Sequence, residues 1–259
     1  MGGAHRVRAP AAAAPPRWRR APLAEGAASR VALPPGRLAR WELRHGRRGG
    51  LGPTGGMVGV APGARIHSLS VFDASGGAPM SRLIEAVDHV ATWKKANPSK
   101  PAVVNMSVGA YLGTTAKNAL DDAVQSLIDL DVPVVVSAGN HKVNASLVSP
   151  AHVPAAITVG AYNGDFEFAR HFSNYGSMVD LLAPGDQIVS GAAGGKYALM
   201  SGTSMAAPHV TGAVALYLAR NPSASAQRVH DEVVKRGKSG FGKNLPRGTT
   251  SRTVWLENL

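Results

Sequence analysis

The most informative stretch of this sequence is Ser201-Gly-Thr-Ser-Met-Ala-Ala-Pro-His-Val210, which places Ser204 at the start of a helix, directly after a glycine-containing turn. Backbone N–H groups at a helix start have no partner within the helix, and the helix dipole favours negative charge there. A serine at this place is therefore well positioned for chemistry that builds negative charge on a bound group. The small residues that follow Ser204 allow this helix to pack close to a sheet.

Strand and helix patterns alternate upstream of this stretch and continue beyond it. Apolar residues recur at helical spacing in some segments, and short runs rich in apolar residues lie between them. We expect strands near residues 64–72, 102–106, 132–137, 156–160, 179–182 and 187–190, and helices near residues 81–96, 114–130, 203–220 and 226–236. This alternation predicts an α/β protein with a mainly parallel central sheet, helices on both faces, and functional loops at the carboxyl ends of the strands.

Length and composition favour one sizeable domain and exclude several classes of function. The chain has 259 residues, 44% of them hydrophobic, which is enough to bury one core. Its longest apolar runs fall far short of the roughly 20 residues that a membrane-spanning helix needs, so we expect no membrane partner. The sequence contains no cysteine, which excludes disulfides, thiolate metal sites and a cysteine nucleophile. Pro15 and Pro16 interrupt the short alanine run near the N-terminus, so no secretion signal is recognisable.

The positive charge is concentrated in the first 48 residues. They hold eleven Arg and two Glu, a net charge of +9 out of the chain's +12, which leaves +3 for the other 211 residues. Because Ala, Arg and Pro dominate this segment, we interpret residues 1–48 as a basic arm that is disordered or mistranslated from another frame. Residues 49–259 would form an incomplete enzyme-like domain. A nucleic-acid-binding role for the arm is the least favoured hypothesis, and it predicts steeply salt-dependent binding.

Two further motifs end in small residues at predicted strand ends. They are Val134-Val-Val-Ser-Ala-Gly-Asn140 and Val103-Val-Asn-Met-Ser-Val-Gly109. Together with the Gly-Thr-Ser-Met-Ala-x-Pro-His pattern around Ser204, they resemble the subtilisin family, particularly its proteinase K-like branch. The resemblance runs from about Gly59 to the C-terminus. It implies a subtilisin-like three-layer fold, a serine endopeptidase activity on polypeptide substrates, a monomer, and an extracellular location.

The resemblance also assigns roles to individual residues. Ser204 would be the nucleophile that forms an acyl-enzyme, and Asn140 would donate to the oxyanion, whereas an Asn that simply tolerates a turn is the alternative. One wall of the primary specificity pocket would consist of Ser107, Val108 and Gly109, and the other of Ser137, Ala138 and Gly139. The alternative for the first wall is an ordinary core strand. His209, five residues beyond Ser204 on the same helix, is structural in the family and is not expected to act in catalysis.

A calcium site is a further implication of the resemblance. Near the family marker Phe172-Ser-Asn-Tyr-Gly176, Asp180 aligns with a calcium-binding carboxylate of proteinase K-like members, aided by carbonyls that match Pro154 and Ala156. The alternative is an exposed aspartate at a strand end, because a Ca²⁺ site usually needs six or more oxygens. Calcium would be structural, and the chemistry itself would require no cofactor.

The family pattern fails at the two remaining catalytic positions. A serine nucleophile needs a base, and the base needs a carboxylate that holds its tautomer. The family order is Asp, His, Ser, but the first aspartate of this chain is Asp73 and no Asp-Ser/Thr-Gly motif precedes it. His45 lies at the spacing expected for the base, although Arg47 and Arg48 replace the residues that should follow it; the alternative is a histidine in a disordered arm.

Three hypotheses therefore stay open. The chain is a serine endopeptidase with an incorrect N-terminal segment, a catalytically dead relative that acts as an interaction protein, or a nucleic-acid-binding protein through its arginine-rich arm. The first is favoured, and without a catalytic carboxylate the chain as written would be nearly inactive, since loss of that group costs about 10⁴-fold.

Overall fold

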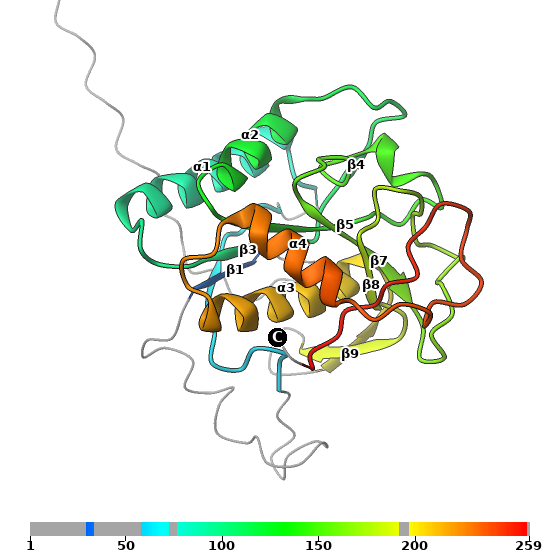
Figure 1. Cartoon of the computed structure of the whole chain (residues 1–259). Helices are drawn as coiled ribbons and strands as arrows, with labels where there is room; N and C mark the ends of the chain where they lie inside the picture. Colours follow the sequence, from blue (N-terminus) through cyan, green and yellow to red (C-terminus); the bar gives the residue numbers. More distant parts are fainter. Residues whose placement is uncertain (1–29, 34–57, 73–76, 192–196, 258–259) are drawn as a thin grey trace, which may run out of the picture.

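The computed structural model describes residues 30–33, 58–72, 77–191 and 197–257, and the structural statements below concern these residues. At its centre lies a six-stranded sheet with the order β2-β1-β3-β5-β7-β8 (Figure 1). These strands are β1 (Arg30–Leu33), β2 (Arg65–Ser68), β3 (Val103–Met106), β5 (Val134–Ser137), β7 (Ile157–Tyr162) and β8 (Leu181–Pro184). From β3 to β8 neighbouring strands are parallel, whereas β1 runs antiparallel to both β2 and β3. The predicted α/β class with a mainly parallel sheet is confirmed.

Helices cover both faces of the sheet and make a three-layer structure (Figure 1). One face carries α1 (Met80–Ala96) and α2 (Ala119–Ile128), and the other carries α3 (Thr203–Arg220) and α4 (Ala226–Arg236). Alternate residues of β3 enter different cores: Val104 packs in the cluster that contains α1 and α2, and Val103 in the one that contains α3. Burial on both faces explains why the central strands are continuous apolar runs.

The side chains of Asn118 and Asp121 define the start of α2. Asn118 accepts from the backbone N–H groups of Leu120 and Asp121, and the Asp121 carboxylate accepts from the Asn118 N–H, which completes a capping box. The helix therefore begins at Ala119, later than the predicted 114. Asp121 is buried and also binds His152 Nε2 at 2.7 Å and Ser149 Oγ at 2.5 Å, which ties α2 to the strand that contains Ser149.

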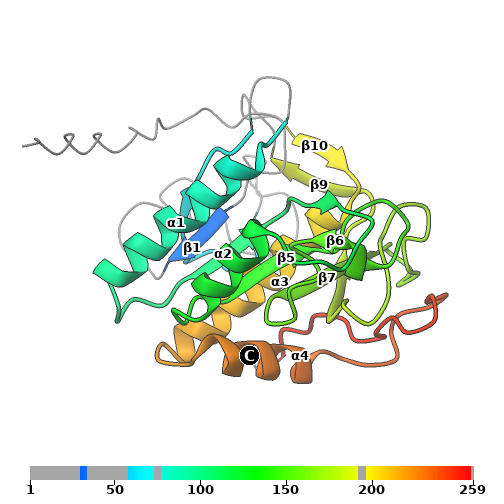
Figure 2. The same cartoon turned by 90° about the horizontal axis from the view of Figure 1, so that it is seen from above.

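The remaining elements are short. β4 (Ala110–Tyr111) pairs with β6 (Val148–Ser149), a 3₁₀ turn spans Ala145–Leu147, and β9 (Ile188–Gly191) pairs with β10 (Tyr197–Met200). The β9–β10 hairpin lies at the edge of the molecule and leads into the start of α3 (Figure 2). None of the helices in the described part of the chain is long and apolar enough to cross a membrane.

Most of the predicted basic arm lies outside the described residues. Its only described part is β1, which the sequence did not predict. The proposed boundary between residues 48 and 49 also lies outside the described ranges, so it stays a prediction.

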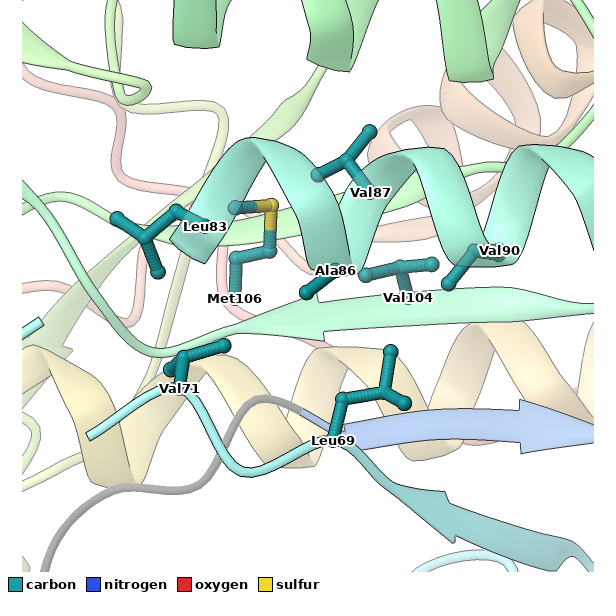
Figure 3. A pocket seen from close by; sticks show the side chains of 8 residues that line it. All are labelled: Leu69, Val71, Leu83, Ala86, Val87, Val90, Val104 and Met106. Carbon is teal, nitrogen blue, oxygen red and sulfur yellow. The ribbon is translucent and has the colours of Figure 1, made fainter. Parts of the chain in front are cut away.

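A cavity of about 20 Å³ lies beneath α1, bounded by β3 and the segment after β2 (Figure 3). All eight residues that line it are apolar: Leu69, Val71, Leu83, Ala86, Val87, Val90, Val104 and Met106. It is roughly large enough for one water molecule, but a water there would find no polar partner among these side chains. We therefore regard it as a packing gap in the core and not as a ligand site.

Candidate active site

The two predicted strand-end motifs and the start of α3 lie together at one edge of the sheet. β3 and β5 are neighbouring parallel strands, with Met106 opposite Val136, so their carboxyl ends lie side by side. Thr203, the first residue of α3, connects this edge to the helix. Its hydroxyl accepts from the Gly139 N–H at 3.1 Å, and its N–H donates to Asn140 Oδ1 at 2.9 Å. The helix start is thus attached to the end of β5.

Asn140 caps α3 from outside the helix. The residue at the N-cap position is Gly202, which has no side chain, and Asn140 Oδ1 accepts from both the N–H and the hydroxyl of Thr203. Because Oδ1 is held by Thr203, the Nδ2 group must point away from it. The side chain of Asn140 is exposed, so Nδ2 is available to a bound molecule.

Asn140 Nδ2 and the backbone N–H of Ser204 lie near each other. The position that a Cβ would take on Gly202 is 3.2 Å from Asn140 Nδ2 and 3.7 Å from Ser204 N. Both groups are hydrogen-bond donors, and both belong to the region where the helix dipole favours negative charge. An oxyanion hole needs two such donors close together, so this pair keeps the predicted role of Asn140 as a hypothesis.

Ser204 is partly exposed, and its side chain reaches toward Ser107, which directly follows β3. Its Oγ donates to the Ser107 carbonyl over a long 3.3 Å, while Ser107 Oγ donates to the Ser204 carbonyl at 2.9 Å. Among the described residues no imidazole hydrogen-bonds to Ser204 Oγ. The predicted base, His45, lies outside the described residues, so its placement is not tested.

The two predicted walls of the specificity pocket follow β3 and β5. Ser107 and Val108 are buried and Gly109 is exposed. On the other wall Ser137 and Ala138 are buried, and Gly139 is only partly so. The structure places both segments at neighbouring strand ends, and their role as walls of a specificity pocket stays a prediction.

The sequence did not single out Asn174, which supports the second wall. Asn174 is fully buried; its Oδ1 accepts from the N–H groups of His141 and Val143, and its Nδ2 donates to the Ala138 carbonyl at 2.8 Å. Gly139 adopts a φ of 100°, and an added Cβ there would overlap the Asn174 side chain. The signal in the sequence was the Phe172-Ser-Asn-Tyr-Gly176 marker, in which Asn174 is the central residue.

His209 faces its own helix. Its Nδ1 donates to the Met205 carbonyl at 2.9 Å, and burial lowers the pKa of the imidazole below its ordinary value. No hydrogen bond joins it to Ser204. The geometry therefore gives His209 a packing role within α3.

The Asp180 carboxylate has two protein partners. One of its oxygens accepts from the Thr158 N–H at 2.7 Å, and the other lies 3.7 Å from His230 Nε2. The Asp180 carboxylate raises the pKa of His230, so the imidazole itself can supply positive charge there. No group of three or more potential metal-binding side chains occurs among the described residues. Calcium at Asp180 therefore stays a prediction that would rely on backbone carbonyls, and the His230 imidazole faces the carboxylate in this structure.

The fold and this site define the class of the protein. It is an α/β protein with a serine at a helix N-terminus and a side-chain amide from a neighbouring strand end. Residues 45–249 match the model of the Subtilase family. An extracellular serine proteinase of Thermus sp. (strain Rt41A) is 43% identical over 199 residues, which is 76% of this chain and 46% of that relative. The chain therefore belongs to the subtilase family.

Two further comparisons agree with this conclusion. Subtilisin E of Bacillus subtilis (strain 168) is 38% identical over 182 residues, or 69% of this chain and 45% of that protein. The crystal structure of a cold adapted subtilisin-like serine proteinase superposes with a TM-score of 0.65 at 39% identity, covering 73% of this chain and 65% of that one. The chain thus spans less than half the length of these two curated relatives.

Proposed function

We propose that this chain carries the nucleophile and oxyanion hole of a serine endopeptidase. Ser204 Oγ forms a bond to the carbonyl carbon of a peptide, and its proton passes to a base. The C–N bond then breaks, the amine leaves with a proton, and water releases the acyl group from Ser204. Asn140 Nδ2 and the Ser204 N–H would stabilise the negative oxygen in between. The observation that supports this proposal is that Asn140 Nδ2 and Ser204 N lie 3.2 Å and 3.7 Å from the position of a Cβ on Gly202, while Asn140 Oδ1 is bound by Thr203.

The base and substrate contacts are part of the same proposal. His45 would accept the proton from Ser204, at the spacing that the family requires. The segments 107–109 and 137–139 would bind a polypeptide by strand pairing and form the walls of the pocket for the residue before the cleaved bond. Because relatives at about 40% identity carry names such as "Extracellular serine proteinase", we also propose that this protein acts outside the cell.

Reaction with a fluorophosphonate probe tests the proposed function. In folded protein, checked by circular dichroism, we expect the probe to label a single serine, with the adduct mapped by mass spectrometry to the peptide that contains Ser204. The Ser204→Ala variant is the matched control and should show no label. Folded wild-type protein that stays unlabelled would refute the peptidase proposal.

A second candidate function is peptide binding without catalysis. No described histidine contacts its hydroxyl, and the sequence has no Asp-Ser/Thr-Gly motif. A catalytically inactive subtilase would still possess both pocket walls and could bind peptides. Failure of Ser204 to react, combined with measurable binding of an extended peptide, would favour this alternative.

A structural calcium ion at Asp180, with the carbonyls of Pro154 and Ala156, stays a separate prediction. It would require the His230 imidazole to give way, since that group now faces the carboxylate. A rise in melting temperature on addition of CaCl₂ that disappears in Asp180→Asn would support calcium binding. The same melting temperature in CaCl₂ and in EDTA would exclude it.

A further inference from the structure

A chain of three buried polar side chains joins β3 to the first turns of α3. Thr211 Oγ1 donates to Asn105 Oδ1 at 2.9 Å, Asn105 Nδ2 donates to Ser107 Oγ at 2.9 Å, and Ser107 Oγ donates to the Ser204 carbonyl at 2.9 Å. The three residues are 7%, 3% and 5% exposed, respectively. Buried polar groups in an apolar layer cost free energy unless they are paired, and here each one is paired.

The last acceptor in this series of hydrogen bonds is the Ser204 carbonyl, which has no donor within its own helix. In an α-helix the carbonyl of Ser204 would accept from the N–H four residues later, but that residue is Pro208, which has no N–H. Ser107 Oγ supplies the missing donor from β3. The peptide unit that follows Ser204 is therefore held by a side chain and not by the helix itself.

Thr211 determines the donor-to-acceptor direction of this series of hydrogen bonds. A hydroxyl has one proton, and that of Thr211 can go to Asn105 Oδ1 or to the Ala207 carbonyl at 3.0 Å. If Asn105 turned its amide over, its oxygen would take the proton of Ser107, and Ser204 would lose its donor. Donation from Thr211 to Asn105 favours the orientation in which Ser107 donates to Ser204.

We propose that Thr211 and Asn105 are positioning residues for Ser204. Through Ser107 they fix the peptide that carries the nucleophile, and they couple its placement to the pocket wall on β3. Neither residue would touch the substrate. This inference deepens the proposed function and rests on it for its meaning, but its physical content can be measured without catalysis.

The absence of cysteine from the chain provides the probe. The Ser204→Cys variant contains a single thiol, at the helix start, where free N–H groups and the dipole stabilise the thiolate. Its alkylation rate with iodoacetamide, measured from pH 5 to 10, reports how well this position is held. No catalytic base is needed for that reaction. Fluorophosphonate labelling of Ser204 in the unmodified chain tests the proposed function separately.

We expect Thr211→Val, made in the Ser204→Cys protein, to raise the pKa of the thiol and to slow alkylation at pH 7 by at least about threefold, the effect of half a pKa unit on the thiolate fraction. Thr211→Ala, which also lacks the hydroxyl but adds no volume, should slow it similarly, and Thr211→Ser should restore the rate. Thr158→Val is the matched control, since Thr158 is buried in β7 and donates its hydroxyl to the Ala151 carbonyl.

The control separates positioning from stability. Both Thr211→Val and Thr158→Val remove one buried hydrogen bond and should lower the melting temperature to a similar extent. Only the change at Thr211 should alter the pKa and the alkylation rate of the thiol at position 204. An unchanged alkylation profile in Thr211→Val and Thr211→Ala, or an equal change in Thr158→Val, would overturn the proposal.

Discussion

Asn140 combines a structural and a chemical role, and two substitutions can separate them. Its Oδ1 accepts two hydrogen bonds from Thr203, whose side chain is fully buried, whereas its Nδ2 is the proposed donor to the oxyanion. Asn140→Ala removes both functions. Asn140→Asp keeps an oxygen at the Oδ1 position, removes the donor and adds a negative charge beside the proposed oxyanion. The two variants should therefore differ in stability but agree in loss of reactivity.

The structure sets the size of each effect. Asn140→Ala loses two hydrogen bonds of about 1 kcal/mol each and leaves the buried N–H of Thr203 unpaired, so the unfolding free energy should fall by about 2 kcal/mol. For a domain of this size that corresponds to a melting temperature about 4–8 °C lower. Asn140→Asp should melt close to the wild type, because a carboxylate also caps a helix and favours its N-terminal dipole.

The reactivity of Ser204 should depend on the Asn140 Nδ2 donor and not on the capping of α3 by Oδ1. Loss of one side-chain donor from an oxyanion hole costs about 2.7–4 kcal/mol, or on the order of 100–1,000-fold in rate; this magnitude was measured on subtilisin, a relative of this chain, and is transferred to it. We expect Asn140→Ala to lose that factor in the rate of phosphonylation at Ser204, and Asn140→Asp to lose at least as much, since its carboxylate also repels the developing negative charge.

Circular dichroism melts and labelling rates on the same preparations measure the two effects. If Asn140→Asp melts as low as Asn140→Ala, the side chain does not cap α3 through its oxygen. If Asn140→Asp reacts at the wild-type rate, Nδ2 does not face the oxyanion. The stability result holds whether or not the wild-type chain reacts with the probe.

Three other perturbations act on contacts around the site. Gly139→Ala should cost about 2–5 kcal/mol, because its φ of 100° disfavours a side chain and the new Cβ would overlap Asn174; an unchanged urea midpoint would contradict this. Asp121→Ala should cost about 3–5 kcal/mol in urea unfolding, because it removes the buried carboxylate that binds Ser149 Oγ, the Asn118 N–H and His152 Nε2, at about 1–1.5 kcal/mol for each hydrogen bond; a loss below 1 kcal/mol would argue against these contacts. Burial lowers the pKa of His209, so the stability gained from its neutral form is present above pH 6.5 and is lost as the pH falls toward the lower folded pKa. The melting temperature should therefore fall between pH 7 and pH 5, and less steeply in His209→Gln; parallel curves would refute this.

Local signals in the sequence were sufficient for the elements that carry the site. The helices at 203–220 and 226–236 have the predicted bounds, because apolar spacing and flanking Gly or Asn residues define them. The strands around Val104 and Val135 were recognisable as continuous apolar runs, since both of their faces are buried. The strand predicted at 64–72 ends at Ser68 in the structure, although Leu69 and Val71 remain buried. Their apolar character reflects packing under α1 and not strand pairing.

Contacts between distant residues could not be predicted in the same way. Thr203 and Asn140 are 63 residues apart, and Thr211 and Asn105 are 106 apart. In the sequence Asn105 is only a polar residue inside an apolar strand, and its partner becomes evident once α3 crosses the sheet. The same holds for Asn174, whose three hydrogen bonds hold a wall that belongs to another strand.

The first turns of α3 show why this site combines stability and chemistry so closely. Gly202 offers no side chain to cap the helix, and Pro208 offers no N–H to the Ser204 carbonyl. Both deficits lie within one turn of Ser204, and both are met from the ends of neighbouring strands, by Asn140 and by Ser107. A helix capped by its own residues could form without these contacts to the strand ends. The start of α3 depends on Asn140 and Ser107, so truncating either side chain should disturb the position of Ser204 as well as the proposed contact with substrate. Only substitutions that keep one hydrogen-bonding atom and remove the other can separate the effect on position from the effect on substrate contact.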